Sequence, residues 1–319
     1  MHEFELINKY FSKLSKNNKS SLNLNDDVFF DKFKELVISI DSYVEGIHFL
    51  DFKKPELVIK KIIRSSLSDL ICKGVNPKYY FISGSGNRLY FNKRNLQKIS
   101  KSLKQEQNKF NINLSGGDTV VSKKLNFSIT SVGFAKKIVF RNNARINDDI
   151  YVTGNLGDSY AGLLILKKKI KVDQNLKKYF TNKYYMPDLN LDLAPVLHTF
   201  ANTSIDISDG LISDLEKLIN KQKLSFRIDL NTIPISNNLR KMIKEKKFKK
   251  KDFISQGDDY QILFTANPSK SRIIRKTAKS LGLKISKIGK ISHNMGKSLF
   301  LDEKGEKIAL KNNGYYHRF

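Results

Sequence analysis

The segment Asp206-Ile207-Ser208-Asp209-Gly210 follows a short apolar run and precedes an apolar helix predicted over Leu211–Leu218. A strand that turns into a helix in this way directs backbone N–H groups toward the turn, where they favour an anion such as phosphate. Asp206 and Asp209 could hold the Mg²⁺ that accompanies the phosphate. Capping of the helix by Ser208 or Asp209 is the simpler alternative. We favour a phosphate and metal site at this junction.

Further acidic residues stand beside Gly, Ser, Thr or Asp along the chain. They are found in Asp26-Asp27, Asp41, Ser68-Asp69, Gly116-Gly117-Asp118-Thr119 and Gly257-Asp258-Asp259-Tyr260. A single Asp at such a place is more often a turn or cap residue than a metal ligand. Their recurrence in a chain with 58 Lys and Arg but only 31 Asp and Glu favours a shared site for Mg²⁺ and phosphate.

Composition limits the class of protein. At 319 residues the chain exceeds the size at which one hydrophobic core usually stops growing, so two domains are expected. No apolar run of about 18 residues predicts a membrane span, and the start of the chain lacks a signal-peptide pattern. The single Cys72 excludes an intrachain disulfide and favours a cytoplasmic location.

The net charge of +27 raises the alternative of a nucleic-acid-binding protein. The basic residues are mostly Lys spread along the chain, and the densest run, 241–251, is typical of a solvated helix or loop. We therefore expect no specific nucleic-acid partner. A basic field would still steer anionic nucleotides toward a site.

Strands and helices alternate in both halves, which predicts an α/β or α+β fold. Predicted strands are Glu35–Asp41, Tyr79–Ser83, Ile112–Leu114, Asn126–Phe134, Ile150–Thr153, Ser204–Ile207, Phe226–Leu230 and Tyr260–Thr265, with helices at Pro55–Lys73 and Asn95–Phe110. This assignment puts Asp41 at the end of a strand and Gly116-Gly117-Asp118-Thr119 in a turn. The polar segment Asn143–Asp149 resembles a linker, so we divide the chain into residues 1–143 and 144–319.

Two other features leave alternatives open. The loop Gly154-Asn155-Leu156-Gly157-Asp158-Ser159 matches neither the dinucleotide fingerprint nor the Walker A motif, and a tight strand-to-helix turn explains it equally well. His48 closely follows Asp41 and is either structural or a substrate contact. No catalytic triad and no protein-kinase signature is present.

Together these residues resemble the thiamine-monophosphate kinase family over nearly the whole chain and in the family's order. The resemblance is carried by Asn25-Asp26-Asp27, 41–49, Ser68-Asp69-Leu70, 116–119, 153–162, 205–211 and 257–260. The segment around His48 and the terminal Gly314-Tyr315-Tyr316-His317 are closer to this family than to its superfamily relatives. Those relatives are aminoimidazole ribonucleotide synthetase, selenophosphate synthetase and a hydrogenase maturation protein.

The resemblance implies a two-domain architecture like that of aminoimidazole ribonucleotide synthetase. The N-terminal sheet domain would dimerise, the C-terminal domain would be α+β, and ATP would lie across the cleft. A phosphoryl group would pass from ATP directly, in line, to thiamine monophosphate, giving thiamine diphosphate. We assign no general base, because the acceptor phosphate is already ionised near neutral pH. A cytoplasmic homodimer is expected.

Family positions imply three sets of site residues. The Mg²⁺ ligands would be Asp27, Ser39, Asp41, Ser42, Asp69, Asp118, Asp206 and Asp209. The ATP contacts would be Gly117, Asp118, Arg141 and Ser208. The contacts to thiamine phosphate would be His48, Asp258 and Tyr315.

The chain departs from the family pattern at four places. Asn25 stands for the first Gly of the Gly-Asp-Asp turn. Ile40 stands for a Thr, Asp258 stands for a Glu, and Met186-Pro187-Asp188-Leu189-Asn190 replaces a segment with two arginines. A second hypothesis is therefore another ATP-dependent synthetase of the same superfamily, acting on a different small acceptor.

Overall fold

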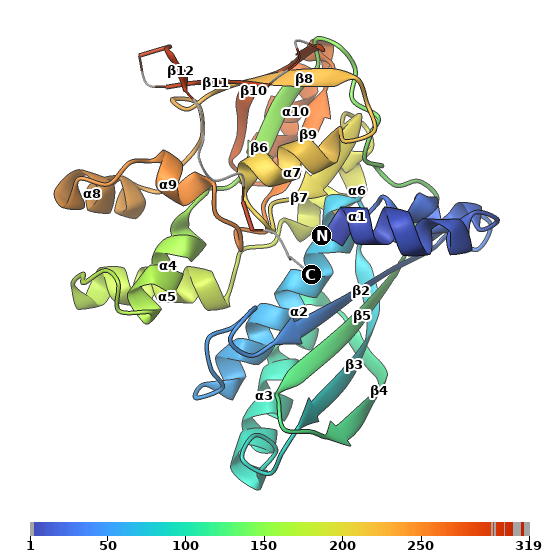
Figure 1. The fold of residues 1–319 in the computed structure, drawn as a ribbon, viewed down its shortest axis with the longest axis vertical. Coiled ribbons are helices and arrows are strands. Elements are labelled where there is room, and N and C mark those ends of the chain that lie inside the picture. The colour runs from blue at the N-terminus through green and yellow to red at the C-terminus, as the bar shows by residue number, and fades with distance from the viewer. Residues whose placement is uncertain (1–2, 295, 297, 303, 309–313, 316–319) are drawn as a thin grey trace.

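The computed structural model of the chain describes residues 3–294, 296, 298–302, 304–308, 314 and 315. It contains two β-sheets that follow one another along the chain. In Figure 1 the N-terminal sheet lies below and the C-terminal sheet above, and helix α2 (Pro55–Cys72) runs between them. The predicted mixture of strands and helices in both halves is confirmed.

The N-terminal sheet has the strand order β1-β2-β5-β3-β4. Its strands are β1 (Phe29–Asp31), β2 (Leu36–Val44), β3 (Pro77–Gly86), β4 (Asn113–Val121) and β5 (Asn126–Phe134). All neighbours are antiparallel except β3 and β4. Helix α2 packs on one face of this sheet and α3 (Lys93–Phe110) packs on α2. The strict burial alternation along β5 fits a sheet that is covered on one face.

The other face of this sheet is apolar and open. Ile40 on β2 is 70% exposed, and Tyr79, Phe81 and Phe134 are also exposed. Ile40 and Phe81 both pair with Thr130 of β5, so their side chains lie in one row on the same face. Single exposed apolar residues need no explanation, whereas a contiguous apolar face marks an interaction surface.

The C-terminal sheet has the strand order β12-β11-β8-β10-β6-β9-β7. Its strands are β6 (Asp149–Thr153), β7 (Thr203–Asp206), β8 (Leu224–Asp229), β9 (Ile262–Ala266), β10 (Ile285–His293), β11 (Leu299–Leu301) and β12 (Lys307–Ile308). The remaining α-helices are α1 (Glu3–Leu6), α4 (Asp158–Leu166), α5 (Gln174–Tyr185), α6 (Ala194–Leu197), α7 (Leu211–Leu218), α8 (Asn237–Lys246), α9 (Lys251–Ile254) and α10 (Ser271–Ser280). A π-helical turn (Ile7–Phe11) and 3-10 turns (Ser12–Ser15, Lys19–Leu24, Leu191–Leu193, Pro268–Lys270) complete the helices described.

Helix α2 is buried nearly all round and therefore contacts both halves. It packs on β2 and β5 of the first sheet and on β7 and α5 of the second half. One of the buried hydrophobic clusters therefore spans both halves, because Tyr43 and Ile62 belong to it together with Tyr184 and Phe264. No helix in the described ranges is both long enough and apolar enough to cross a membrane.

Two sequence-based expectations about the acidic segments are wrong. Strand β2 pairs with β5 as far as Val44, so Asp41 lies inside the strand and not at its end. The segment 116–119 lies inside β4, which pairs with β3 as far as Val121. A Cβ atom on Gly117 would lie 1.9 Å from the carbonyl oxygen of Ile82, so close packing against β3 requires this glycine.

Candidate functional site

Four predicted metal ligands meet where α2 lies between β2 and β7. Asp69 is on α2, and the hydroxyl of Ser39 on β2 donates to its Oδ2 at 2.5 Å. The neighbouring Ser68 donates to Oδ2 of Asp206, at the end of β7, at 2.7 Å. Successive residues of a helix point about 100° apart, so Ser68 and Asp69 of α2 can each contact a strand of a different sheet. Asp41 completes the group, because its charge acts on Asp69.

The three carboxyl groups are hard to ionise together. Burial raises the pKa of Asp41 to about 6, although hydrogen bonds, first that from Tyr43, oppose the rise. Burial also raises the pKa of Asp206 to about 6, and the charge of Asp214 adds to that shift. The pKa of Asp69 lies well above its usual value, first through burial and then through the charges of Asp41 and Asp206. A bound cation would relieve this repulsion.

The donor atoms of this group suit Mg²⁺, which prefers carboxylate and other oxygen ligands. Over the described ranges, no three Asp, Glu, His or Cys side chains are assembled as a ready metal site. Asp69 and Asp206 are each held by a serine hydroxyl instead. The residues therefore fit the ion by chemistry, and substrate phosphates and water would complete its coordination.

The second acidic pair, Asp26-Asp27, is matched by basic side chains. Lys73 Nζ lies 2.8 Å from Asp26 Oδ1 and 2.7 Å from Asp27 Oδ2. Arg141 bonds Asp27 through its guanidinium and Asp26 through its backbone N–H, the latter at 2.9 Å. Burial alone would lower the pKa of Lys73, but nearby acidic groups, led by Asp26, hold that pKa above its usual value. The predicted metal ligand Asp27 and the predicted ATP contact Arg141 thus bind each other.

The predicted phosphate turn is closed by an internal carboxylate. The backbone N–H groups of Asp209 and Gly210 both donate to Asp214 Oδ2 at 3.0 Å. The expectation that these N–H groups face a phosphate is therefore wrong for this conformation. The side chain of Asp209 pairs with Lys217, whose Nζ also lies 2.9 Å from Asp214 Oδ1. The carbonyl oxygen of Ser208 accepts a hydrogen bond from the Asp258 N–H at 2.9 Å.

Asp258 stands between this turn and helix α2. Its Oδ1 lies 2.8 Å from Nζ of the buried Lys61 and accepts the hydroxyl of Tyr260 at 2.9 Å. The backbone of Asp258 has a positive φ of 68°, so its side chain is held by a strained main chain as well as by an ion pair. The structure thus brings one predicted acceptor contact beside the predicted phosphate turn.

The other two predicted acceptor contacts lie on separate segments. His48 accepts the Val44 N–H at Nδ1, at 3.0 Å, so a neutral His48 carries its proton on Nε2. Tyr315 donates its backbone N–H to the carbonyl oxygen of Asp209 at 3.0 Å, which places it next to the β7–α7 turn. Tyr316 and His317 lie outside the described residues.

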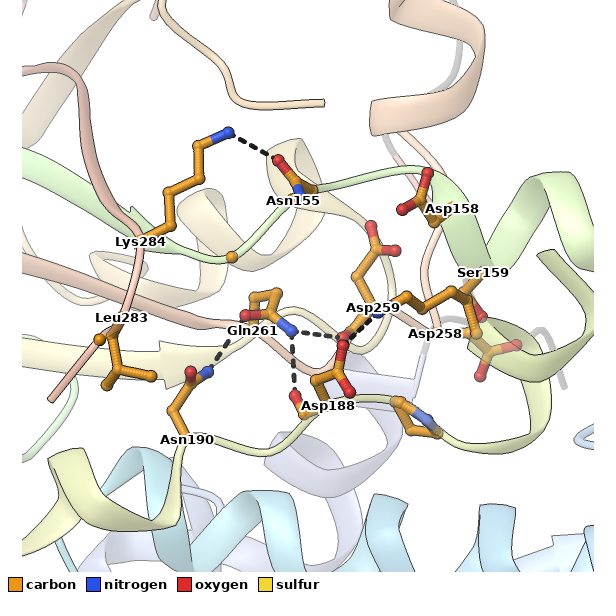
Figure 2. Close-up of a pocket in the computed structure, with 14 residues that line it drawn as sticks. Asn155, Asp158, Ser159, Asp188, Asn190, Asp258, Asp259, Gln261, Leu283 and Lys284 are labelled. Atoms are coloured by element: carbon orange, nitrogen blue, oxygen red, sulfur yellow. Dashed lines mark hydrogen bonds and ion pairs between the residues drawn. The ribbon is translucent and has the colours of Figure 1, made fainter. Parts of the chain in front are cut away.

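Asp258 also lines a polar cavity of about 210 Å³ in the C-terminal half. Figure 2 shows the residues of its walls, which come from Lys183 and from the segments 154–159, 187–190, 258–261 and 282–284. Gln261 links two of them, because it accepts the Thr153 hydroxyl at 2.9 Å and donates to the Asp188 carbonyl at 3.0 Å. The hydroxyl of Ser159 is buried without a hydrogen-bond partner among the described residues. Such a wall suits a polar ligand.

Three of the predicted residues lie apart from the carboxylate group. Ser42 is exposed, and its hydroxyl lies 3.0 Å from that of Ser128, on the face of β2 opposite to Asp41. Gly117 lies in the same cross-strand row as Asp41 but beyond β5 and β3. Three strand spacings correspond to about 14 Å. Asp118 is exposed and accepts the N–H of Thr119 at 2.7 Å.

Sequence reasoning missed four charged residues of this region, which are Lys61, Lys73, Asp214 and Lys217. The two residues on or next to α2 interrupt an apolar pattern, and a buried lysine requires an acidic partner. Asp214 stands in the first turn of α7, where an acidic residue commonly caps backbone N–H groups. These local signals identify the residues, although not their partners.

Comparison with known proteins places these features in a family. Residues 25–135 match the family model of the AIR synthase related protein, N-terminal domain. The chain is 34% identical to the thiamine-monophosphate kinase of Buchnera aphidicola subsp. Acyrthosiphon pisum, over 99% of this chain and 98% of that protein. It is 32% identical to the thiamine-monophosphate kinase of Haemophilus influenzae, over 93% and 91% of the two chains.

Solved structures show the same fold. AaThiL complexed with AMPPCP and TMP matches with a TM-score of 0.84 at 26% identity, over 99% of this chain and 97% of that one. The thiamine monophosphate kinase of Aquifex aeolicus matches with a TM-score of 0.79 at 26% identity, over 97% and 99%. The hydrogenase maturation protein HypE of Escherichia coli shares the fold with a TM-score of 0.67 at 17% identity, over 87% and 85%.

We expect Asp206→Asn to stabilise the metal-free protein near neutral pH. Because the folded-state pKa of about 6 exceeds the ordinary 3.8, the folded wild type binds more protons than the unfolded chain. Its free energy of unfolding should therefore fall as pH rises from about 4 to about 6. The variant has no carboxyl group to titrate at this position. Its free energy of unfolding should therefore exceed that of the wild type by roughly 1–3 kcal/mol at the end of that pH window, and the difference should stay constant at higher pH. Urea denaturation in EDTA between pH 4 and 8 measures the difference, and a pH-independent difference would contradict the prediction.

Proposed function

The chain belongs to the thiamine-monophosphate kinase family, and we propose that it transfers the terminal phosphoryl group of ATP to thiamine monophosphate, giving thiamine diphosphate. The observation that carries this proposal is the group of Asp41, Asp69 and Asp206, in which two half-buried carboxyl groups and one buried carboxyl group meet from three elements. The full-length similarity to thiamine-monophosphate kinases and the fold shared with AaThiL complexed with AMPPCP and TMP support it.

We propose that Asp41, Asp69, Asp206 and Asp209 hold Mg²⁺, with Ser39 beside them. When bound, Mg²⁺ supplies positive charge that offsets the repulsion between two anionic reactants. Lys217 pairs with Asp209 and fixes its carboxylate at the edge of the group. The metal roles of Asp27, Ser42 and Asp118 and the ATP contacts of Gly117, Asp118, Arg141 and Ser208 stay predictions.

The chain's own residues have to position the reactants more than to move protons. A phosphate monoester is largely ionised near neutral pH, since its second pKa is about 6, so no side chain has to remove a proton from the acceptor. Positioning and electrostatic stabilisation can then supply most of the rate enhancement. Direct in-line transfer without a phosphoenzyme follows from this reasoning, and we assign no general base.

We propose that the acceptor's cationic and amino-bearing rings lie toward Asp258 and the cavity behind it. The cavity wall contains Asp158, Asp188 and Asp259 as well as Lys183, which pairs with Asp188, and Lys284. With Asp258 included, its carboxyl groups outnumber its lysines, which supports a cationic ligand. The unpaired hydroxyl of Ser159 offers a further polar contact. His48 and Tyr315, which lie on other segments, would approach the phosphate and ring from the opposite side.

We also propose that the protein is a cytoplasmic homodimer. The open apolar face defined by Ile40, Tyr79, Phe81 and Phe134 supports this assembly, because burying it against a second copy would remove a large apolar area from water. The cytoplasm supplies ATP and keeps the buried thiol of Cys72 reduced.

Asp209→Asn tests the proposed reaction. The variant keeps the side-chain shape but removes one charge, so turnover of thiamine monophosphate with ATP and Mg²⁺ should fall on the order of 100-fold. Asp252→Asn makes the same charge change at an exposed residue of α9 and should leave turnover unchanged. Chromatographic detection of thiamine diphosphate measures the rate, and circular dichroism checks the fold. A wild type that binds Mg-ATP but makes no thiamine diphosphate would overturn the proposed acceptor.

Asp258→Asn tests the acceptor end of the site. Loss of a charged hydrogen-bond partner costs about 1.5–3 kcal/mol, so KM for thiamine monophosphate should rise roughly 10- to 100-fold while Mg-ATP affinity stays close to that of the wild type. Asp258→Glu keeps the charge that pairs with Lys61 and should retain a low KM. Equal increases in KM for both substrates would indicate general disruption and contradict the assigned role.

The homodimer should be visible in solution. Sedimentation equilibrium at micromolar concentration should give about twice the chain mass of 36.7 kDa. Ile40→Lys together with Phe81→Lys places charge on the open face and should shift the equilibrium to monomer. The matched change Leu89→Lys, at an exposed residue outside the sheet, should leave the dimer intact. A wild-type monomer at all concentrations would refute the assembly.

A further inference from the structure

Lys73 follows the last residue of α2 and has no exposed surface. Its Nζ lies 2.8 Å from Asp26 Oδ1, 2.7 Å from Asp27 Oδ2 and 2.8 Å from the carbonyl oxygen of Ser204. A lysine ammonium has three donors, and here three acceptors use all of them. The ammonium is therefore fully coordinated by oxygen atoms from the N-terminal turn and from β7, as a small cation would be.

Charge is balanced at this turn without any added ion. Asp26 and Asp27 contribute two negative charges, and Lys73 and Arg141 contribute two positive ones. Both oxygens of Asp27 are used, because Arg141 contacts Oδ1 and Lys73 contacts Oδ2. An added metal ion would have to displace a buried ammonium or guanidinium from this carboxylate.

The carboxyl groups of the neighbouring group, Asp41, Asp69 and Asp206, are not matched by ion pairs in this way in the part of the chain that the structure describes. Within the described residues, Asp41, Asp69 and Asp206 form no ion pair with a lysine or arginine, and hydroxyl groups are their direct partners. Both acidic groups lie against the C-terminal part of α2. Lys73 and Arg141 pair directly with one group, whereas Lys73 and Lys217 act on the other through their charge without an ion pair.

We propose that Lys73 is a built-in cation that replaces one metal ion at Asp26-Asp27, so that metal binds only on the side of Asp41, Asp69 and Asp206. Lys73 is then a positioning residue that fixes the Asp26-Asp27 turn and, through Asp26, the backbone of Arg141. The inference rests on the proposed function only for the identity of the ion. Under this proposal Asp27 binds Lys73 and not the metal ion that its sequence position predicts.

The test compares Lys73→Met with the wild type in the absence of nucleotide. Methionine keeps a long unbranched side chain but leaves the turn with one uncompensated negative charge. The variant should melt at a lower temperature in EDTA, and saturating Mn²⁺ should raise its Tm by at least roughly 3 °C more than that of the wild type. Electron paramagnetic resonance should count one more bound Mn²⁺ in the variant.

Lys61→Met is the matched control, because Lys61 is the other fully buried lysine of α2 and pairs with Asp258 outside the proposed metal group. It should lose stability without an added response to Mn²⁺. An identical Mn²⁺ count in Lys73→Met and the wild type, or an identical metal response in both lysine variants, would overturn the proposal.

A second variant keeps the proposal testable if Lys73→Met does not fold. In the wild-type background, Asp27→Asn should leave the number of bound Mn²⁺ ions unchanged, whereas Asp69→Asn should lower it. A loss of one ion in Asp27→Asn would show that Asp27 is a metal ligand and would overturn the proposal. These counts require neither ATP nor thiamine monophosphate, so they remain informative even if the proposed reaction is wrong.

Discussion

Buried like charge at one end of α2 is the constraint on which the rest of the site depends. An ionised carboxylate is costly to bury without a partner, and several lie within reach of this helix. The chain provides two kinds of partner for these carboxylates. Lys73 and Arg141 form ion pairs with one acidic group, and the hydroxyls of Ser39 and Ser68 donate hydrogen bonds to the other. Hydroxyls hold a carboxylate in place but do not neutralise it. The second group is therefore left with a charge that a ligand can satisfy.

The same helix also holds residues of the proposed acceptor site. Lys61 binds Asp258, and Arg64 donates to the carbonyl oxygen of Pro187 at 3.1 Å while pairing with the buried Glu106. Pro187 and Asp258 both belong to the wall of the polar cavity. The cavity wall and the carboxylate group are thus both held by α2, which would fix the proposed acceptor site relative to the proposed metal site.

Much of the fold, and the residue types of the site, could be predicted from the sequence. Which strands pair with one another and which charged side chains form ion pairs could not. Strand Asn126–Phe134 and helix Leu211–Leu218 were predicted with their observed bounds, because their apolar spacing is regular. The sequence predicts Asp41 at a strand end, because the run of apolar residues stops there. Pairing with the distant strand β5 extends β2 beyond this point. The partners of Lys73 are far away in sequence, and no local pattern reveals them. Asp41, Asp69 and Asp206 do converge, the acidic segment 116–119 lies apart from them, and the counter-charges are set by the tertiary fold.

The core that joins the two sheets limits how this molecule can open. In many two-domain enzymes a cleft closes by a hinge between separately packed bodies. Here Tyr43 of the first sheet and Phe264 of the second belong to one buried cluster around α2, so a hinge motion would expose apolar surface to water. We therefore expect access to the site to depend on loops and side chains at its rim more than on a hinge between the two sheets.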